Sequence, residues 1–276
     1  MRSKVILSFL AIVFTFLAIW QGVHAWNKQE VAEYTDSVSK TDIRHEAAKM
    51  PDQPYSHVKF SMRTEEKDFY ILNGDKKREI VSVLEKLPKE HISTLQNVVL
   101  DYNPNAHRGL GGKSIIIIRA VDIDPTEFFA VMIHEIGHNV DLGYLGETSQ
   151  KKTSGFIDGK KPVYETDPSL DFYRISWEND KTRKKTAGNQ DFVSGYAMTD
   201  PFEDFAESYV YYILHNKDFK SKTQNSDNLL AKYEYMKNTV FDGEEFETGE
   251  YLTENLNRQP WDITVLSYSL SAFLAS

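Results

Sequence analysis

The residues best suited to chemistry in this chain are His134, Glu135 and His138, which lie in the run His-Glu-Ile-Gly-His. Side chains at positions i and i+4 of an α-helix lie on one face, so both imidazoles can bind one metal ion. Glu135 can reach a metal-bound water without binding the metal itself. A Zn²⁺ ion with three protein ligands keeps an open position and lowers the pKa of a water there to about 7. The motif therefore predicts a zinc site with a carboxylate base beside it.

The residues around the motif favour a metal site over a helix with two ordinary polar histidines. The stretch 126–140 is rich in large apolar side chains, and a helix of that composition is largely buried. Two buried imidazoles and a buried glutamate without partners would cost several kcal/mol, so they need a metal or a hydrogen-bond network. Asp124 as the N-cap and Pro125 in the first turn predict where this helix begins.

A third metal ligand is expected on a second helix, which Asp200 and Pro201 predict to begin there. Glu203 and Glu207 are four residues apart and lie among apolar and aromatic residues, so they share a face of that helix. Buried carboxylates need a cation or hydrogen-bond donors. We expect Glu203 to bind the metal and Glu207 to orient a metal-binding histidine. The alternative is a solvated acidic stripe that includes Asp204.

Two positions shortly after His138 are further candidates, one for a third metal ligand and one for a hydrogen-bond partner of an imidazole. Position 144 carries a third ligand in some metallopeptidases, but it is a tyrosine here. Asp141 lies one turn beyond His138, where it is better placed to accept a hydrogen bond from an imidazole than to reach the metal. Asp141 can equally be a helix cap or a surface residue.

In combination, these motifs resemble the gluzincin class of zinc peptidases. In particular, they resemble the catalytic domain of anthrax lethal factor and the related secreted Pro-Pro endopeptidases. In that family a tyrosine precedes the metal-binding glutamate by seven residues, as Tyr196 precedes Glu203 here. The helix then continues Glu-x-Phe-Ala-Glu, as it does at 203–207. The resemblance covers about residues 75–215. The segment between the two motifs is longer than in those relatives, so the resemblance does not predict the shape of the substrate cleft.

The resemblance implies an α+β, zincin-like metallopeptidase fold. That fold has a small twisted sheet, an edge strand beside the motif helix and a mostly helical C-terminal part. It also implies one catalytic Zn²⁺ and peptide-bond hydrolysis by a zinc-activated water. The residues that it assigns are the zinc ligands His134, His138 and Glu203, the general base Glu135, the oxyanion donor Tyr196 and the supporting residue Glu207. The alternative for Tyr196 is an ordinary core aromatic residue, because a lone tyrosine is a weak signal without geometry.

The N-terminus has the pattern of a secretory signal peptide over residues 1–25. Arg2 and Lys4 precede an uncharged apolar run from 5 to 20, and Ala25 ends a suitable cleavage site. An uncleaved anchor is the alternative, although the run is short for a membrane span. Residues 26–56 are polar and read as an arm or linker, which leaves 57–276 as the metallopeptidase domain.

Composition narrows the possible partners. The formal net charge is −9 and becomes −11 if the two basic residues of the signal peptide are removed, which disfavours nucleic acid and anionic lipid as partners. The chain has no cysteine, so disulfides and thiol catalysis are excluded. We expect a protein or peptide substrate and no stable membrane insertion after signal cleavage. The sequence makes no prediction of oligomeric state.

Periodicity and turn residues predict the remaining elements. A glycine-rich turn is expected at 109–112, and the isoleucine strand after it could pair with an extended peptide or be an ordinary core strand. The predicted strands are 58–62, 95–102 and 114–119, the predicted helices are 80–87, 201–215, 229–238 and 262–275, and the predicted irregular segments are a polar loop at 147–161 and a partly helical stretch at 166–187.

Three functions follow from these patterns. The leading one is a secreted zinc-dependent endopeptidase with Glu135 as its general base. The second is a non-catalytic secreted or surface module that keeps the fold, against which the presence of a base, three ligands and a tyrosine argues. The third is a toxin-like component whose peptidase acts on one specific protein.

Overall fold

The protein is described here from a computed structural model. The predicted signal peptide (1–25) and nearly all of the predicted arm (26–56) lie outside the described residues. The described residues belong to one compact unit, Ile43–Ser276. None of the helices that they form is long and apolar enough to cross a membrane. The structure describes residues 55–64, 68–104, 106–146, 152–249 and 259–275.

Helices and small sheets combine in a mixed architecture that is compatible with the predicted α+β class. The main sheet has five strands in the order β2-β1-β3-β5-β4, of which β1, β3 and β5 are parallel, whereas β2 and β4 pair antiparallel at its two edges. The two central parallel strands, β3 and β5, are rich in branched apolar residues that are buried on both faces. The strands are β1 (Lys59–Arg63), β2 (Phe69–Ile71), β3 (Asn97–Asp101), β4 (Gly109–Gly111) and β5 (Ile115–Arg119).

The three predicted strands are confirmed by β1, β3 and β5, but the prediction of a glycine-rich turn at 109–112 is wrong. Residues Gly109–Gly111 form β4, which pairs antiparallel with β5 and occupies the edge of the sheet. The isoleucine strand is therefore interior, and among the described residues β4 is the edge strand on this side of the sheet. Glycine has a low strand propensity, so this pairing is decided by the neighbouring backbone and not by the residues themselves.

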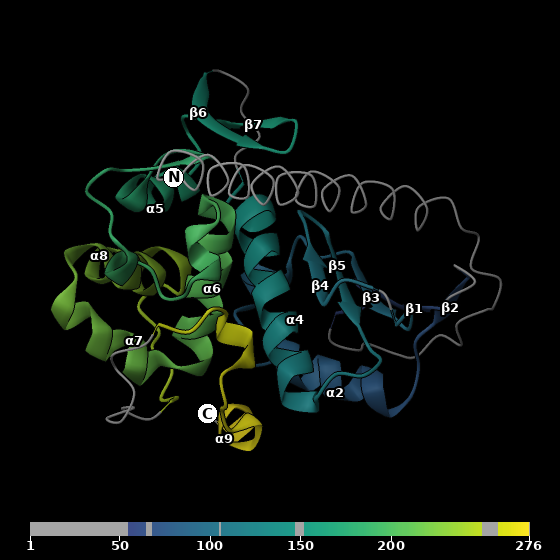
Figure 1. Cartoon of the computed structure of the whole chain (residues 1–276). Helices are drawn as coiled ribbons and strands as arrows, with labels where there is room; N and C mark the ends of the chain where they lie inside the picture. The colour runs from purple at the N-terminus through teal and green to yellow at the C-terminus, as the bar shows by residue number, and fades with distance from the viewer. Residues whose placement is uncertain (1–54, 65–67, 105, 147–151, 250–258, 276) are drawn as a thin grey trace, which may run out of the picture. The chain divides into compact units, whose positions relative to one another are not determined.

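Two long helices, α4 (Pro125–Asn139) and α6 (Pro201–Leu214), lie side by side, and α4 also contacts β4 and β5 (Figure 1). The side-chain oxygen of Asp124 accepts a hydrogen bond from the backbone N–H of Thr126 at 2.8 Å. The carboxylate of Asp200 accepts from the N–H groups of Phe202 and Glu203, both at 2.9 Å. Both predicted helix starts are confirmed, and these caps satisfy N–H groups that a helix leaves free.

Two predicted segments differ from the structure, one by being more regular than expected and the other by being less regular. The predicted polar loop at 147–161 contains strand β6, which forms a hairpin with β7. The predicted helix at 262–275 is a 3₁₀ turn, η6, followed by an extended stretch and a short helix. The remaining elements are α2 (Asp75–Leu84), α3 (Lys89–Ile92), β6 (Thr153–Asp158), β7 (Lys161–Tyr164), α5 (Ser169–Ser176), β8 (Trp177–Asn179), β9 (Thr182–Arg183), α7 (Asn216–Lys222), α8 (Asp227–Tyr235), η6 (Ile263–Val265) and α9 (Leu270–Ala275).

The core that supports the two long helices is dominated by aromatic side chains. Every residue of α6 is buried. Phe205 contacts the rings of Phe172 on α5 and Tyr235 on α8, at centroid distances of 5.2 and 6.4 Å. Aromatic pairs of this kind add to the stabilisation from area burial. A chain without cysteine thus holds α6 in place by packing on several sides.

Candidate metal centre

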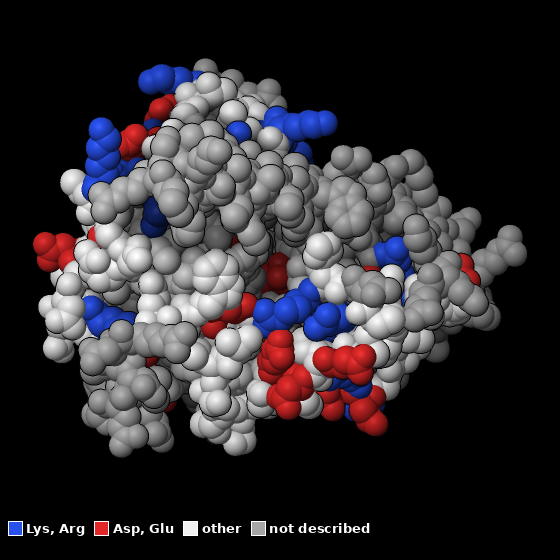
Figure 2. Space-filling view, in the orientation of Figure 1, with Lys and Arg blue, Asp and Glu red and all other residues white. Residues whose placement is uncertain are grey.

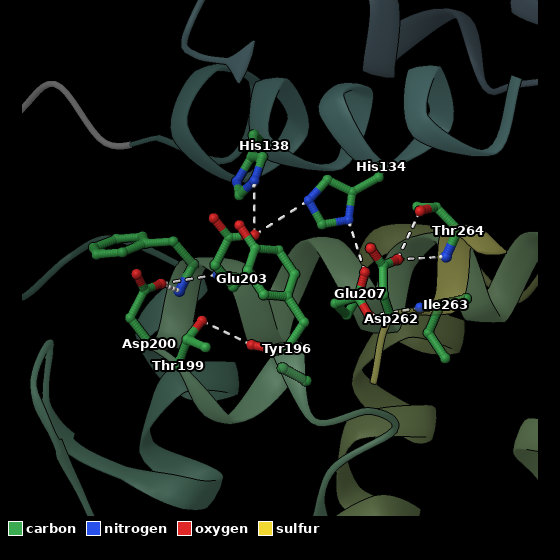
Figure 3. A network of polar contacts seen from close by, with 12 residues as sticks. His134, His138, Tyr196, Thr199, Asp200, Glu203, Glu207, Asp262, Ile263 and Thr264 are labelled. Carbon is green, nitrogen blue, oxygen red and sulfur yellow. Dashed lines mark hydrogen bonds and ion pairs between the residues drawn. The ribbon is translucent and has the colours of Figure 1, made fainter. Parts of the chain in front are cut away.

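The side chains of His134, His138 and Glu203 converge between α4 and α6 (Figure 3). The Nε2 atoms of His134 and His138 lie 3.2 and 3.3 Å from the same oxygen, Oε2 of Glu203. The three residues are buried, and each offers a ligand atom within 4.8 Å of the other two. Ligands at about 2 Å from a tetrahedral Zn²⁺ lie roughly 3.3 Å apart. The donor types and their spacings therefore fit a zinc ion.

A glycine within the motif allows the two helices to approach this closely. A Cβ atom on Gly137 would lie 3.1 Å from the Cα of Ala206 and 3.2 Å from the Cβ of Tyr209, both on α6. Such contacts are too tight for most side chains in a packed interior. The small residues Gly137 and Ala206 thus bring the histidine face of α4 within reach of Glu203.

Glu207 contacts the other side of the first imidazole. Its Oε1 lies 3.0 Å from Nδ1 of His134, while its Oε2 accepts from the hydroxyl of Ser194 at 2.6 Å and from the backbone N–H of Ile263 at 2.9 Å. A carboxylate on the second nitrogen selects the tautomer whose Nε2 is free to bind a metal. Glu203 and Glu207, one helical turn apart, therefore contact the two nitrogens of one ring.

Glu135 is buried beside β4, with backbone close to its carboxylate. A Cβ atom on Gly109 would lie 2.1 Å from Oε1 of Glu135, and one on Gly111 would lie 2.6 Å from Oε2. Burial raises the pKa of Glu135, although the charges of the two histidines act in the opposite direction. The two glycines of β4 thus leave the space that this carboxylate occupies.

Tyr196 lies against the first histidine, and Figure 3 shows its ring extending from the backbone towards Glu203 and the two imidazoles. The rings of Tyr196 and His134 are stacked, with centroids 6.1 Å apart and planes at 30°. Burial, followed by the negative charge of Glu203, raises the pKa of Tyr196 well above its usual value. The phenol is therefore a hydrogen-bond donor throughout the neutral range.

Asp141 is placed differently from what a regular helix predicts. Both of its carboxylate oxygens accept from the hydroxyl of Tyr173, at 2.7 and 2.6 Å, and burial raises its pKa to about 7. In the described part of the chain its hydrogen bonds do not reach an imidazole. The reason is the π-helical turn η1 (Val140–Tyr144) that follows α4, because a wider turn shifts the side chains after it around the helix axis.

The charges in the centre support one another. Burial alone would lower the pKa of His134, but its hydrogen bonds to Glu203 and Glu207 outweigh burial and raise this pKa well above its usual value. Burial alone would raise the pKa of Glu203, but the two histidines hold it well below its usual range. The glutamate is thus ionised at neutral pH, and a metal ion that binds here must displace the proton that the raised pKa keeps on His134.

The structure also brings residues to the site that sequence reasoning did not identify. Ser194 and Ile263 donate to Glu207, and Gly109 and Gly111 adjoin Glu135. Two glycines that alternate with other residues have the period of a strand face, which is the one signal that could have indicated β4. The contact from Ile263 is made by the main chain and leaves no signature in the sequence.

The geometry therefore combines two imidazoles, a carboxylate ligand, a second carboxylate on one imidazole and a buried glutamate next to an edge strand. This donor set is typical of a zinc ion with an open coordination position. Comparison of the chain with protein-family models finds no match, and comparison with curated protein sequences finds no significant match either.

Proposed function

We propose that the protein is a secreted zinc-dependent endopeptidase with a zincin-like fold of the gluzincin class. The observation that carries this proposal is the buried convergence of His134, His138 and Glu203, with Glu135 on the same helix as the two histidines. Zincs with three protein ligands and an open position are the catalytic ones. When bound, the ion would supply Lewis-acid chemistry by lowering the pKa of a water and polarising a carbonyl.

The remaining chemistry belongs to side chains of the protein. Glu135 accepts a proton from the attacking water and passes it to the leaving amine, a task that suits a carboxylate with a raised pKa. The protonated phenol of Tyr196 donates to the oxygen on which negative charge develops. One such donor is typically worth roughly 10²–10³ in rate.

The edge strand offers a place for an extended peptide. β4 is the last strand of the sheet on its side among the described residues, and two of its three residues adjoin Glu135. A peptide that adds to such an edge forms main-chain hydrogen bonds and brings its carbonyls near the base. This arrangement supports a protein or peptide substrate. The face in Figure 2 intersperses acidic with basic side chains among the described residues, which gives no support to a nucleic-acid surface.

The decisive experiment is the variant Glu135→Gln, tested on a broad peptide library after full loading with zinc. We expect zinc binding to stay within about twofold of wild type and cleavage to fall by roughly 10²–10⁴. Exposed Glu178 of β8 provides the control, and Glu178→Gln should cleave like wild type. Unchanged cleavage by zinc-loaded Glu135→Gln would refute the mechanism. A zinc-loaded wild type that cleaves no peptide would favour a non-catalytic module.

A further inference from the structure

The segment 259–265 lies against the candidate site although it is distant in sequence from both long helices. Its turn η6 begins at Ile263, whose backbone N–H donates to Oε2 of Glu207 at 2.9 Å (Figure 3). The other oxygen of Glu207 contacts Nδ1 of His134 at 3.0 Å. The segment thus contacts directly the carboxylate that orients this imidazole.

The same segment fixes the backbone that leads into Tyr196. The N–H of Gly195 donates to the carbonyl of Pro260 at 2.8 Å, and the N–H of Tyr196 donates to the carbonyl of Trp261 at 2.6 Å. The indole of Trp261 covers Gly195 so closely that a Cβ there would lie 2.5 Å from its Cε3. Two hydrogen bonds and this ring contact therefore fix the position of the backbone from which the Tyr196 side chain extends.

Arg108 fastens the segment to the motif helix and to the edge strand. Its guanidinium lies 2.6 Å from the carboxylate of Asp262, 2.7 Å from the hydroxyl of Thr264 and 2.8 Å from the carboxylate of Glu127 on α4. Arg108 directly precedes β4. A guanidinium binds such a set of oxygens well because its donors diverge in one plane. One arginine thus connects the segment to the helix that carries Glu135 and to the strand beside it.

We propose that residues 260–263 are a positioning segment of the metal centre. They orient Glu207, and through it the His134 imidazole, and they hold the backbone of Tyr196. As far as activity is concerned, this inference rests on the proposed peptidase function, but its effect on the metal ligands is independent of any reaction. Loss of a hydrogen bond that orients a metal ligand typically costs about 10–100-fold in metal affinity or activity.

The test is the substitution Ile263→Pro compared with Ile263→Val. Proline removes the N–H that reaches Glu207, and it suits the first position of a helical turn. Asp262 has φ −146° and ψ 133°, a conformation that a residue before proline readily adopts. Valine keeps the N–H and has a side chain of similar volume. We expect the zinc dissociation constant of Ile263→Pro to exceed that of Ile263→Val about tenfold or more, measured by competition with a chelator.

Peptide cleavage provides the second measurement. We expect kcat of Ile263→Pro to fall about tenfold relative to Ile263→Val, with KM within about twofold, because the segment acts on the ligands and not on the substrate. Equal zinc affinities for the two variants would overturn the proposal. If zinc-loaded wild type cleaves nothing, the peptidase function fails, while the zinc comparison still decides the role of the segment.

A second pair of variants covers the case in which proline prevents folding. Asp262→Asn weakens the contact with Arg108, and Glu165→Gln weakens a comparable ion pair with Arg174, 2.7 Å long, away from the segment. We expect Asp262→Asn to raise the zinc dissociation constant several-fold and Glu165→Gln to leave it unchanged. Equal effects of the two would show that the segment does not position the centre.

Discussion

Helix α6 carries buried carboxylates on two sides, and the two sides are neutralised in different ways. Asp204 contacts Nζ of Lys232 at 2.7 Å and the indole N–H of Trp177 at 2.9 Å, and both ionic side chains are fully buried. Glu203 and Glu207 contact imidazoles instead, and no lysine or arginine of the described residues forms an ion pair with them. The side with Asp204 contains a permanent cation, the ammonium of Lys232. The side with Glu203 and Glu207 has a site where a metal cation could bind.

The pKa values express the same difference. Burial raises the pKa of Asp204 to about 6, even though Lys232 and Trp177 act against it. The pKa of Glu203 is held well below its usual value, because two histidines contact a single oxygen. The charge of Asp204 is balanced by Lys232 within the protein, whereas the ionised carboxylate of Glu203 can bind a metal ion.

The largest effect is expected from Glu203→Gln on the open side. An amide oxygen is uncharged and a weak zinc ligand, so we expect the zinc affinity to fall by about 100-fold or more. We also expect peptide cleavage to become undetectable. Chelator competition measures the affinity, and thermal unfolding of the metal-free protein shows that the fold persists. Zinc binding at wild-type strength would show that Glu203 is not a ligand, and that the two sides of α6 do not differ in the way described.

Asp204→Asn is the matching change on the closed side. It leaves the Lys232 ammonium buried without a charged partner, which typically costs about 3–5 kcal/mol. We expect urea unfolding to show a loss of that size, with zinc affinity of the folded variant within about twofold of wild type. The double variant Asp204→Leu with Lys232→Met is the control and should regain most of the stability. A large loss of zinc affinity in Asp204→Asn would show that the two sides are coupled.

A smaller effect concerns two further histidines that adjoin α6. His91 contacts the hydroxyl of Tyr209 at 2.9 Å, and His215 directly follows the helix. Burial lowers the pKa of each to about 4, so both are neutral in the folded protein at pH 6.5. Between pH 6.5 and 4 the unfolded chain therefore binds more protons than the folded one, and the free energy of unfolding falls as the pH falls.

The expected loss approaches about 3 kcal/mol for each of these histidines once the pH is below 4. Urea unfolding at pH 7 and pH 5 measures the first part of this loss, about 2 kcal/mol for each histidine, and His215→Gln should flatten this pH dependence. An unchanged slope in His215→Gln would mean that this imidazole is not buried in its neutral form.

The parts of the site that lie within single helices could be predicted from the sequence. The spacing of His134 and His138 and the proline after each cap are local signals, and the structure places both helices accordingly. The juxtaposition of Glu203 with the histidines required a chemical argument, namely that buried carboxylates need cations. Asp141 escaped prediction because its position depends on a π-helical turn that periodicity does not reveal.

The edge strand and the positioning segment could not be predicted for a different reason. Gly109 and Gly111 favour a turn when they are considered alone, and only pairing with β5 makes them a strand. Ile263 and Trp261 contribute backbone groups, which every residue possesses, so their roles depend on where the chain passes and not on side-chain type. Contacts between main-chain atoms and distant segments are thus the part of a site that a motif search overlooks.

The glycines of β4 have a consequence for altering this protein by design. The space beside Glu135 is bounded there by main chain, with room for no atom beyond the hydrogens of Gly109 and Gly111. A library of side chains at these two positions would displace the Glu135 carboxylate before it changed the shape of the site. If the proposed function holds, new selectivity would have to be engineered in segments other than β4.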